Sequence, residues 1–394
     1  MNEISLLIGL KNNLEYSQKF YENTRTNFPE QEIVFVSFGS TDGTHDWLDS
    51  LNDPNLIYYY SEESKSLSDT YNKAIQIASK EYVCFLHNDM VLGHHFIDNL
   101  QKHLSEDKIV CYKAVEPPVF AGDPRSWKTV EDFGSDFSNF QYDSFFTFEN
   151  ENVKKYNELI SVNDTTFFIS VSRKKLIEIK GLDPLFFPMF CEDDDLIIRL
   201  KLNGVKLFLA QGSMVYHFVS KTSRFSEEFS KKTRIVEENS FRNFTRKWHF
   251  YTYSQIKKTF NIGFVLKNTT DDIIKAIEPF ATTIYTDDIN LVNSYLEKEK
   301  LQSKVDIEAK FKALKTEKNN DIIITINSKK WKSKSQKIVN NIPEIIDKLG
   351  SKKTFSKMFF GFDKVYIKYG IKIEILNKQS YEYQNVNKSY NEFF

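Results

Sequence analysis

Short apolar segments alternate with helix-like segments over the first ninety residues. The apolar runs predict four strands, at 4–9, 32–38, 55–60 and 82–87. Apolar positions at helical spacing predict helices between them, at 14–26, 44–51 and 66–79. This alternation is typical of an α/β protein with a mostly parallel sheet flanked by helices. Sheets of this kind bind ligands beyond the carboxyl ends of their strands.

A long segment at 115–150 interrupts the pattern. Its prolines, glycines and aromatic residues predict an excursion over one face of the sheet. Regular elements resume after it: a strand at 164–172, a short helix from Arg173, a helix at 192–204, strands at 205–210 and 213–218, and a charged helical segment at 226–249.

A second alternating pattern begins after about residue 258. It predicts strands at 261–267, 281–287, 320–327 and 363–370, with helices at 271–280, 290–301 and 335–350. No glycine-rich phosphate loop follows any of these strands, so we expect no nucleotide site there. The sequence therefore indicates two domains, a larger one at 1–250 and a smaller α/β domain at 258–394.

The composition is that of a globular chain of 394 residues, 41% of them hydrophobic. No apolar run approaches the roughly 20 residues that cross a bilayer, and the N-terminus has no signal-peptide pattern. The three cysteines are an odd number without metal-type spacing. We therefore expect a reduced, cytoplasmic protein with no transmembrane segment.

Charge is unevenly distributed along the chain. Residues 251–394 carry 25 Lys, no Arg and 17 acidic residues, a formal charge of +8, which leaves −9 for residues 1–250. Two units with different partners are one interpretation, with peripheral membrane contact for the basic unit and no nucleic-acid partner. A solvated lysine surface is the other.

Polar residues end the strand at 82–87. Asp89, flanked by His87 and Asn88, can hold Mg²⁺ or Mn²⁺ at the carboxyl end of a parallel strand. Equally, Asn88 and Asp89 can cap the helix that begins near His94.

The segment "FGSTDGTHDWL" at 38–48 follows a strand and opens a helix. Gly39 and Gly43 allow tight turns, and Ser40, Thr41 and Asp42 offer short polar groups. An ordinary turn with a helix cap explains the segment as well as a ligand site does.

Acidic residues open the predicted helix at 192–204, where the helix dipole favours them in any case. Asp193 shares the apolar face of Leu196, Ile197 and Leu200, so it should point inward and can act as a base. We expect Asp195 to form a surface pair with Arg199, four residues on, and Asp194 to face water.

His217 ends an apolar run, as Asp89 does, and precedes the polar segment at 220–224. A lone strand histidine is more often a hydrogen-bonded core residue. Here Lys221 and Arg224, with three hydroxyl residues, also suit a diphosphate.

Together these segments resemble glycosyltransferase family 2, the nucleotide-sugar-dependent transferases of GT-A fold. The resemblance runs from Ile4 to about His249 and rests on "ISLLIGLKNN", "GSTDGT", "SDTYNKAIQIASKEYVCFLHND", "FFPMFCEDDDLIIRLKLNG" and "VYHFVSKTSR". It implies a Rossmann-like mixed sheet and a metal-dependent inverting transferase of polysaccharide biosynthesis. The donor would be a nucleotide-diphosphate sugar, and the acceptor a hydroxyl of a glycan or glycoconjugate.

The resemblance also implies roles for individual residues. Asp89 and His217 would hold Mn²⁺ or Mg²⁺, and Asp193 would be the catalytic base. The donor-binding set would be Gly9, Lys11, Gly39, Ser40, Asp42, Asn72, His87, Asn88, Lys221 and Arg224. Trp127 and Glu192 would contact the acceptor, and the aromatic residues Phe133, Phe137, Phe140 and Tyr142 could stack on sugar rings or form the excursion's own core.

The sequence departs from the family pattern at two places. His87 opens the metal triplet where the family usually has aspartate, and Ser37 and Phe38 stand where paired aspartates help to bind the nucleobase. We expect UDP, with dTDP and GDP left open. Two alternatives are a nucleotidyltransferase that makes nucleotide sugars, poorly supported by "GLKNNLEYS", and a catalytically degenerate GT-A binding or scaffold module.

Overall fold

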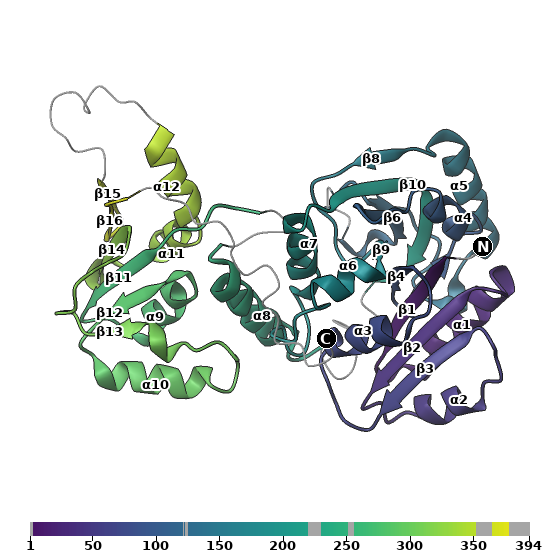
Figure 1. Ribbon diagram of the computed structural model, residues 1–394, viewed down its shortest axis with the longest axis horizontal. Helices are drawn as coiled ribbons and strands as arrows, with labels where there is room; N and C mark the ends of the chain where they lie inside the picture. The colour runs from purple at the N-terminus through teal and green to yellow at the C-terminus, as the bar shows by residue number, and fades with distance from the viewer. Residues whose placement is uncertain are drawn as a thin grey trace. The chain divides into compact units, whose positions relative to one another are not determined.

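The computed structural model describes residues 3–120, 122, 125–219, 230–250, 256–351 and 365–377 (Figure 1). Contacts between residues divide the chain into two compact units, one running to Glu237 and the other beginning at Glu238. The division lies inside a helix, earlier than the boundary at residue 250 that the sequence suggests.

The first unit is built on one ten-stranded sheet with the order β3-β2-β1-β4-β9-β6-β10-β5, to which β7 adds beside β6 and β8 beside β10. Strands β1, β2, β3 and β4 are mutually parallel, as are β6 and β10, while β9 and β5 run antiparallel to their neighbours. The strands are β1 (Ile4–Leu10), β2 (Glu32–Phe38), β3 (Leu56–Ser61), β4 (Tyr82–Leu86), β5 (Met90–Leu92), β6 (Lys108–Glu116), β7 (Lys128–Val130), β8 (Leu159–Ser161), β9 (Ile169–Ser172) and β10 (Lys206–His217). The expectation of a mixed, mostly parallel sheet is confirmed.

Helices cover this sheet, and its central strands are buried from end to end. Continuous apolar runs such as "YVCFL" in β4 have this arrangement because both faces of a central parallel strand are covered. The helices are α1 (Leu14–Asn27), α2 (Thr44–Ser50), α3 (Leu67–Ile77), α4 (Phe96–Gln101), α5 (Tyr142–Lys155), α6 (Arg173–Glu178) and α7 (Glu192–Leu202), with the short helices η1 (Pro118–Phe120) and η2 (Phe137–Asn139).

Three details of the first unit correct the sequence interpretation. The two strands expected at 205–210 and 213–218 are one strand, β10, with a bulge between Ala210 and Met214. Gly212 sits in that bulge, and its carbonyl accepts from Nδ2 of Asn99. The strand expected from 164 begins only at Ile169, and the excursion contains a helix, α5, that the aromatic-rich sequence did not reveal.

The second unit has its own six-stranded sheet with the order β13-β12-β11-β14-β16-β15, and isoleucine dominates its core. The strands are β11 (Ile262–Lys267), β12 (Thr283–Tyr285), β13 (Phe311–Lys312), β14 (Ile322–Asn327), β15 (Val365–Lys368) and β16 (Ile371–Ile375). The helices are α8 (Thr233–Trp248), which the division between the units cuts, α9 (Asp271–Ile277), α10 (Ile289–Glu299), α11 (Ser333–Val339) and α12 (Ile342–Ser351), with η3 (Glu278–Phe280), η4 (Glu308–Lys310) and η5 (Ser328–Lys330). The single helix expected at 335–350 is therefore two, and β13 and β16 were not foreseen.

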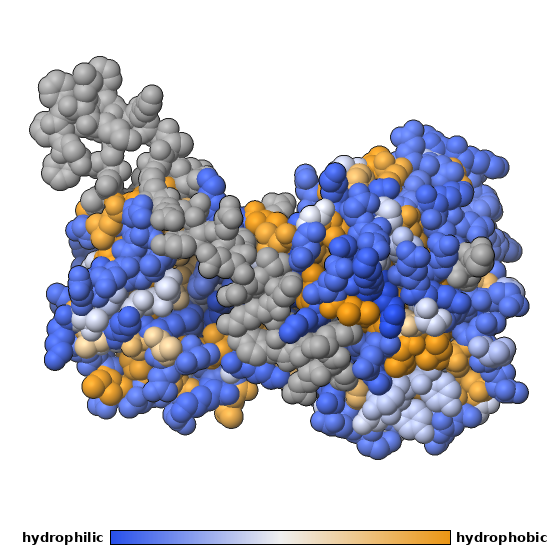
Figure 2. Space-filling view, in the orientation of Figure 1, coloured by the Kyte–Doolittle hydropathy of each residue, from blue (hydrophilic) through white to orange (hydrophobic). Residues whose placement is uncertain are grey.

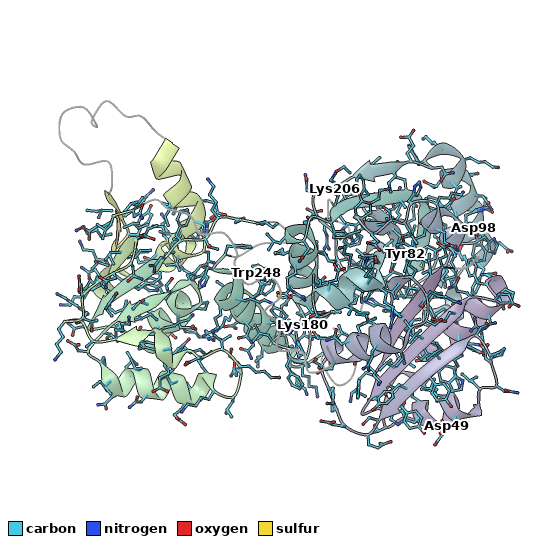
Figure 3. The ribbon with its side chains drawn as sticks, viewed as in Figure 1. Asp49, Tyr82, Asp98, Lys180, Lys206 and Trp248 are labelled. Atoms are coloured by element: carbon cyan, nitrogen blue, oxygen red, sulfur yellow. The ribbon has the colours of Figure 1, made fainter. Side chains whose placement is uncertain are left out.

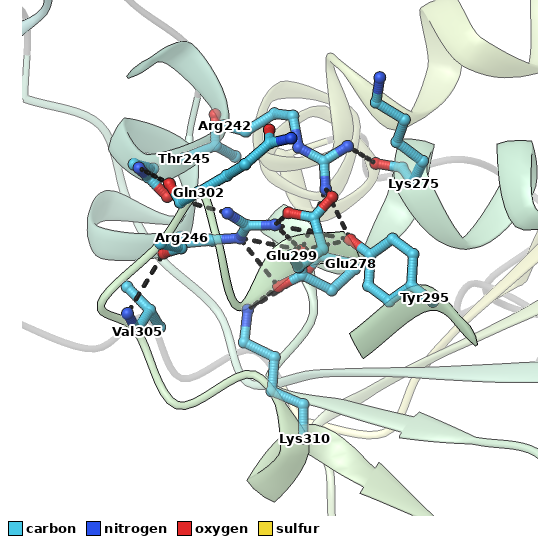
Figure 4. A network of polar contacts seen from close by, with 12 residues as sticks. Arg242, Thr245, Arg246, Lys275, Glu278, Tyr295, Glu299, Gln302, Val305 and Lys310 are labelled. Atoms are coloured by element: carbon cyan, nitrogen blue, oxygen red, sulfur yellow. Dashed lines mark hydrogen bonds and ion pairs between the residues drawn. The ribbon is translucent and has the colours of Figure 1, made fainter. Parts of the chain in front are cut away.

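A buried ionic cluster explains why most of α8 belongs to the second unit (Figure 4). Arg246 of α8 lies 2.7 Å from Oε2 of Glu278 and also pairs with Glu299. Lys310 lies 2.8 Å from the other oxygen of Glu278, and Arg242 lies 3.0 Å from Glu299. Breaking a buried pair leaves an uncompensated charge, so these contacts fix α8 against η3 and α10.

Hydrophilic residues cover most of the visible surface of both units (Figure 2). Among the described residues, the helices are all too short or too polar to traverse a bilayer.

Candidate active site

Three polar side chains converge where β4, β5 and β10 meet. His87 and Asp89 lie in the turn between β4 and β5, and His217 is the last residue of β10. Their ligand atoms all lie within 4.8 Å of one another. His87 follows the last residue of β4, and His217 is the last residue of β10, so the cluster lies at the carboxyl ends of these two strands. Tyr82 and Lys206, labelled in Figure 3, are the first residues of the same strands.

The register of the sheet brings His217 to this point. On one side of β10, His217 pairs with Met90 of the antiparallel strand β5, which directly follows Asp89. On the other side, Tyr216 pairs with Val115 of the parallel strand β6, which directly precedes Glu116. His217 is therefore held between Asp89 and Glu116 by backbone pairing.

The two nitrogens of the His217 ring face different carboxylates. Nδ1 lies 2.8 Å from Oε1 of Glu116, whose other oxygen lies 2.8 Å from Nζ of Lys128. Nε2 is buried without a hydrogen-bond partner among the described residues, 3.5 Å from Oδ1 of Asp89. An ionised carboxylate only accepts hydrogen bonds, so Glu116 holds a proton on Nδ1. Nε2 faces Asp89, where a bound cation would replace the proton that this nitrogen carries when the ring is charged.

The charges at the cluster favour a bound cation. Burial alone would lower the pKa of His217, but Asp89 and Glu116 outweigh it and raise the pKa to about 9. Burial lowers the pKa of His87 to about 4, so this ring is neutral near pH 7. A carboxylate and two imidazoles are ligands that divalent metals accept, and the residues present therefore fit such an ion.

The acidic residues at the start of α7 differ in their surroundings. Asp193 is half-buried, and its Oδ2 accepts a hydrogen bond of 2.5 Å from the hydroxyl of Thr166. Glu192 is buried, and its Oε2 has no hydrogen-bond partner among the described residues. Burial, with the charge of Asp193, raises the pKa of Glu192 well above its usual range.

Residues 166–168, just before β9, link α7 to the cluster of His87, Asp89 and His217. Thr166 bonds Asp193, and Phe167 and Phe168 pack against the ring of His87 with centroids 6.0 and 5.9 Å away. Tyr71 of α3 packs against Phe167, with the two ring centroids 4.8 Å apart and the rings tilted. Burial raises the pKa of Tyr71, and the charges of Asp89 and Glu192 raise it further.

The turn at 39–43 is bonded to the end of β1. Nζ of Lys11 donates to the carbonyls of Phe38 and Gly39, and Oγ of Ser40 accepts from the amide of Asn12. Asp42 accepts from the amide of Leu14 and from the Thr44 hydroxyl. Gly39 has φ +66°, and a Cβ there would lie 2.9 Å from Nζ of Lys11. The polar groups of this turn thus mainly bond one another.

Three other members of the expected donor-binding set have structural partners. Asn72 is fully buried, and its amide bonds both the carbonyl and the N–H of Leu182 at 2.8 Å. Asn88 donates to Ser17 of α1. Gly9 faces α3, where a Cβ would lie 3.0 Å from Thr70. Asn72 therefore offers no spare polar group to a donor. Lys221 and Arg224 lie outside the described residues.

The aromatic residues of the excursion pack on one another. Phe133, Phe137 and Phe140 join Phe145, Tyr216 and Phe218 in a separate apolar cluster, which favours a core of their own over sugar stacking. Trp127 is only 2% exposed and packs edge-on against Phe168 at 5.0 Å. Its ring face is covered by Arg125, so a direct stacking contact with an acceptor is not available.

The expected surface pair of Asp195 and Arg199 is wrong. Both side chains are completely buried, with Nε of Arg199 2.7 Å from Oδ2 of Asp195 and Nη1 bonded to the carbonyl of Ile179. Helical spacing predicted the pair correctly, but this side of α7 is buried and lies against Ile179.

Sequence reasoning missed Glu116, Lys128 and Thr166. The sequence carried a weak indication that Glu116 belongs to the site. It ends a mostly apolar strand, as His217 does, and Asp89 comes shortly after one. Lys128 and Thr166 lie in segments without a pattern, and only the fold shows their partners.

Comparison with known proteins gives a family match for the N-terminal part of the chain. Residues 5–176 match the family model described as glycosyl transferase family 2. The search of curated proteins returned no match. The family match covers the strands β1 to β9 and both residues of the β4–β5 turn in the cluster, and it includes neither α7 nor β10.

Several solved structures are similar at low identity. A mannosyltransferase, PcManGT, from Pyrobaculum calidifontis, in complex with GDP-Man and Mn²⁺, is 15% identical with a TM-score of 0.42, over 62% of this chain and 63% of its own. S. aureus TarS 1-349 in complex with UDP-GlcNAc is 16% identical with a TM-score of 0.40, over 59% and 65%. GalNAc-T7 with UDP, GalNAc and Mn²⁺ is 13% identical with a TM-score of 0.45, over 63% and 48%.

The matched region thus spans less than two thirds of each of these proteins. TM-scores at this level carry no argument about ligands or activity. The assignment rests on the sequence model, which agrees with the family and the enzyme class that the motifs indicated. Residues 5–176 of this chain thus match glycosyl transferase family 2, the family that the motifs resemble.

Proposed function

We propose that this protein is a metal-dependent inverting glycosyltransferase. It would move a sugar from a nucleotide-diphosphate donor to a hydroxyl group of a glycan or glycoconjugate. The observation that carries the proposal is the cluster of His87, Asp89 and His217, linked through residues 166–168 to the acidic start of α7. A transferase of this kind needs a cation site for the diphosphate and a base for the acceptor within one site.

Asp193 is the proposed base. Its Oδ2 is oriented by the Thr166 hydroxyl, and it is half-buried, so it can both reach an acceptor and stay in place. Glu192, the residue before it, is the proposed contact for the acceptor, and its burial disfavours a second negative charge beside Asp193. Asp193 takes the acceptor proton as that oxygen attacks the anomeric carbon of the donor from the opposite side, which inverts its configuration.

His87, Asp89 and His217 would hold a divalent ion such as Mn²⁺ or Mg²⁺. When bound, the ion supplies positive charge to the departing diphosphate. Glu116 and Lys128 act behind His217: the carboxylate fixes the ring, and the ammonium group offsets the carboxylate's charge. The family resemblance assigns Lys221 and Arg224 to the diphosphate as well.

We propose UDP as the nucleotide. Position 37 offers no free side-chain group for a base, because Oγ of Ser37 is buried between Ser40 and His45 at 2.8 and 3.1 Å. Other groups near the ends of β1 and β2 must then recognise the nucleobase of the donor.

The nucleotidyltransferase alternative has little support in the structure. That chemistry requires a basic loop after β1 that is free to bind a triphosphate. Nζ of Lys11 instead donates hydrogen bonds to the carbonyls of Phe38 and Gly39 and to the hydroxyl of Ser64. The scaffold alternative is not favoured either, because a module that binds no cation has no need for two carboxylates around one buried histidine.

The test is release of nucleoside diphosphate from a panel of UDP-, GDP- and dTDP-sugars with MnCl₂. We expect one donor to be hydrolysed slowly by the wild-type protein and not by Asp89→Ala. Asp98→Ala, which removes an acidic side chain on α4, is the control. Release of pyrophosphate from a nucleoside triphosphate and a sugar phosphate would instead identify a nucleotidyltransferase, and no turnover of any donor or acceptor would support the scaffold.

A further inference from the structure

One surface of the second unit gathers lysines from two segments that are distant in the sequence. Four lysines lie within six residues, between the end of β14 and the first turn of α11, and one more ends β15. Together they form the lysine patch, which consists of Lys329, Lys330, Lys332, Lys334 and Lys368. All five residues are exposed.

The two segments are joined at the turn between β15 and β16. Strand β14 pairs with β16, and the amide of Asn327 donates to the carbonyl of Gly370 at 2.8 Å. Oγ of Ser335 in α11 donates to the carbonyl of Tyr369, also at 2.8 Å. A Cβ at Gly370 would lie only 2.7 Å from Cβ of Lys330, so the two segments touch here. The fold of this unit therefore holds the patch together.

The ring of Tyr369 stands among the lysines. Nζ of Lys334 lies 5.4 Å from the centroid of this ring, and Nζ of Lys368 lies 5.2 Å from it. Tyr369 is 40% exposed, and Ile367, two residues earlier, is 71% exposed. The surface thus combines clustered positive charge with an aromatic ring and an aliphatic side chain that both contact water.

Acidic neighbours do not offset the charge of the patch. Residues 322–343 contain no Asp or Glu, and none of the five lysines forms an ion pair with another residue in the described part of the chain. Other exposed lysines of this unit are paired: Lys298 with Asp271, and Lys300 with Glu297. Because like charges held close together repel one another, the patch favours an anionic partner that spreads over all of it.

We propose that the lysine patch binds the surface of an anionic lipid bilayer, with Tyr369 and Ile367 entering the headgroup region. Lysine clusters of this size are attracted to anionic headgroups, and tyrosine is favoured at the boundary between membrane and water. Ile367 gains from leaving water at such a surface, whereas a nucleic acid or an acidic glycan offers charge without an apolar layer. The inference is independent of the proposed function, because the patch lies in the second unit.

The test is flotation of the full-length protein with lipid vesicles. One set of vesicles contains phosphatidylcholine alone, and the other contains about 30 mol% phosphatidylserine as well. We expect binding to the anionic vesicles at low ionic strength and none to the neutral ones. Binding should fall steeply in about 0.5 M NaCl, because salt screens the attraction between exposed charges.

A pair of double variants separates the patch from the net charge of the chain. Lys330→Gln/Lys334→Gln should reduce the affinity for anionic vesicles by roughly 25-fold, about fivefold for each lysine removed. Lys298→Gln/Lys300→Gln is the matched control, since it removes the same charge from exposed lysines outside the patch, and its affinity should stay near that of the wild type. Ile367→Ser should weaken binding at every salt concentration, because apolar burial does not depend on charge screening.

Several results would overturn the inference. Equal binding of the wild-type protein to neutral and anionic vesicles is one, and it needs no variant to fold. Equal losses of affinity in the two double variants are another, because net charge alone would then explain the binding. Tighter binding of poly(U) or dextran sulfate than of anionic vesicles, lost in Lys330→Gln/Lys334→Gln, would show that the patch serves a soluble polyanion instead.

Discussion

Nδ1 of His217 lies 2.8 Å from Oε1 of Glu116, while Nε2 of the same ring lies 3.5 Å from Oδ1 of Asp89. The ring therefore bridges two carboxylates, one in the β4–β5 turn and one at the end of β6. Lys128 pairs with Glu116, the carboxylate farther from the proposed metal site. A chain of contacts therefore runs from the ammonium group of Lys128 through Glu116 to His217. Contacts of this kind orient metal ligands from behind.

Removing the outer carboxylate should weaken metal binding without removing a ligand. We expect Glu116→Ala to lower Mn²⁺ affinity by about 10- to 100-fold, because His217 loses the acceptor that fixes its tautomer and orientation. Glu116→Gln keeps a carbonyl acceptor and should recover part of the loss. Glu62→Ala is a matched control, since it removes an exposed carboxylate that also bonds a histidine, His45. Equal affinities in wild type and Glu116→Ala, measured by calorimetry, would contradict a positioning role.

Replacing the proposed base should affect turnover and spare binding. Asp193→Asn preserves the size of the side chain and its bond from Thr166 but removes the proton acceptor. We expect sugar transfer to fall by roughly 10² or more, with donor and Mn²⁺ affinities near those of the wild type. Asp194→Asn, on the next residue of α7, should retain most activity. Near-normal transfer by Asp193→Asn in a product assay would rule out the assignment.

The buried pair in α7 should be important for stability. Asp195→Ala leaves the guanidinium of Arg199, which is completely buried, without its carboxylate, and we expect a loss of about 3–5 kcal/mol. Glu106→Ala breaks the exposed pair with Lys174 and should cost no more than about 1 kcal/mol. Chemical denaturation of the two variants compares them, and similar midpoints would show that the pair contributes little.

The ionic cluster of the second unit should make stability depend on acid pH. Its surroundings change the pKa of Glu278 in opposite directions: burial raises it, but Lys310 and Arg246 outweigh burial and hold it far below its ordinary value of 4.5. The unfolded chain then binds a proton that the folded chain does not. The stabilising effect of Glu278 is complete above about pH 4.5 and declines as the pH falls below that value.

Thermal unfolding of the full-length protein between pH 3 and pH 7 measures this dependence. Glu278→Gln should lower the melting temperature at pH 7 and reduce the difference between pH 7 and pH 3. Glu297→Gln, which alters an exposed pair with Lys300, should leave both unchanged. A Glu278→Gln profile parallel to that of the wild type would contradict the role of this carboxylate.

The position of the unit boundary predicts where the chain can be shortened. A chain ending at residue 249 keeps Arg242 and Arg246 without Glu278 and Glu299, so we expect it to be less stable than a chain ending at Glu237. If the second unit captures the acceptor or mediates assembly, the chain ending at Glu237 should still bind Mn²⁺ and slowly hydrolyse the donor, while sugar transfer to the acceptor drops. Transfer at the full-length rate by the shorter chain would refute that role.

Much of the first unit could be read from the sequence because its information is local. Buried parallel strands are continuous apolar runs, so β1, β2 and β4 were predicted within one residue at their ends. Strand ends were also visible, because Asp89 and His217 interrupt or close such runs. The spacing of Asp195 and Arg199 revealed a pair, although periodicity on one helix says nothing about what covers it.

Some features depend on contacts between distant segments, and no local pattern encodes them. Glu116 meets both His217 and Lys128 because β6 lies between β10 and β7, a register set by the whole sheet. Thr166 reaches Asp193 only because the chain before β9 crosses α7. The bulge at Gly212 and the attachment of α8 to Glu278 likewise depend on partners far along the chain.

The sequence by itself therefore determined the α/β class, the order of the main elements and the residues at the carboxyl ends of the strands. Only the tertiary structure decided which of those residues meet. It grouped His87 with Asp89 and His217, and it committed Asn72 and Trp127 to buried packing. The physical reason is that hydrophobic periodicity specifies local conformation and burial, whereas ligand sets form from strand register and long-range packing that a linear pattern does not contain.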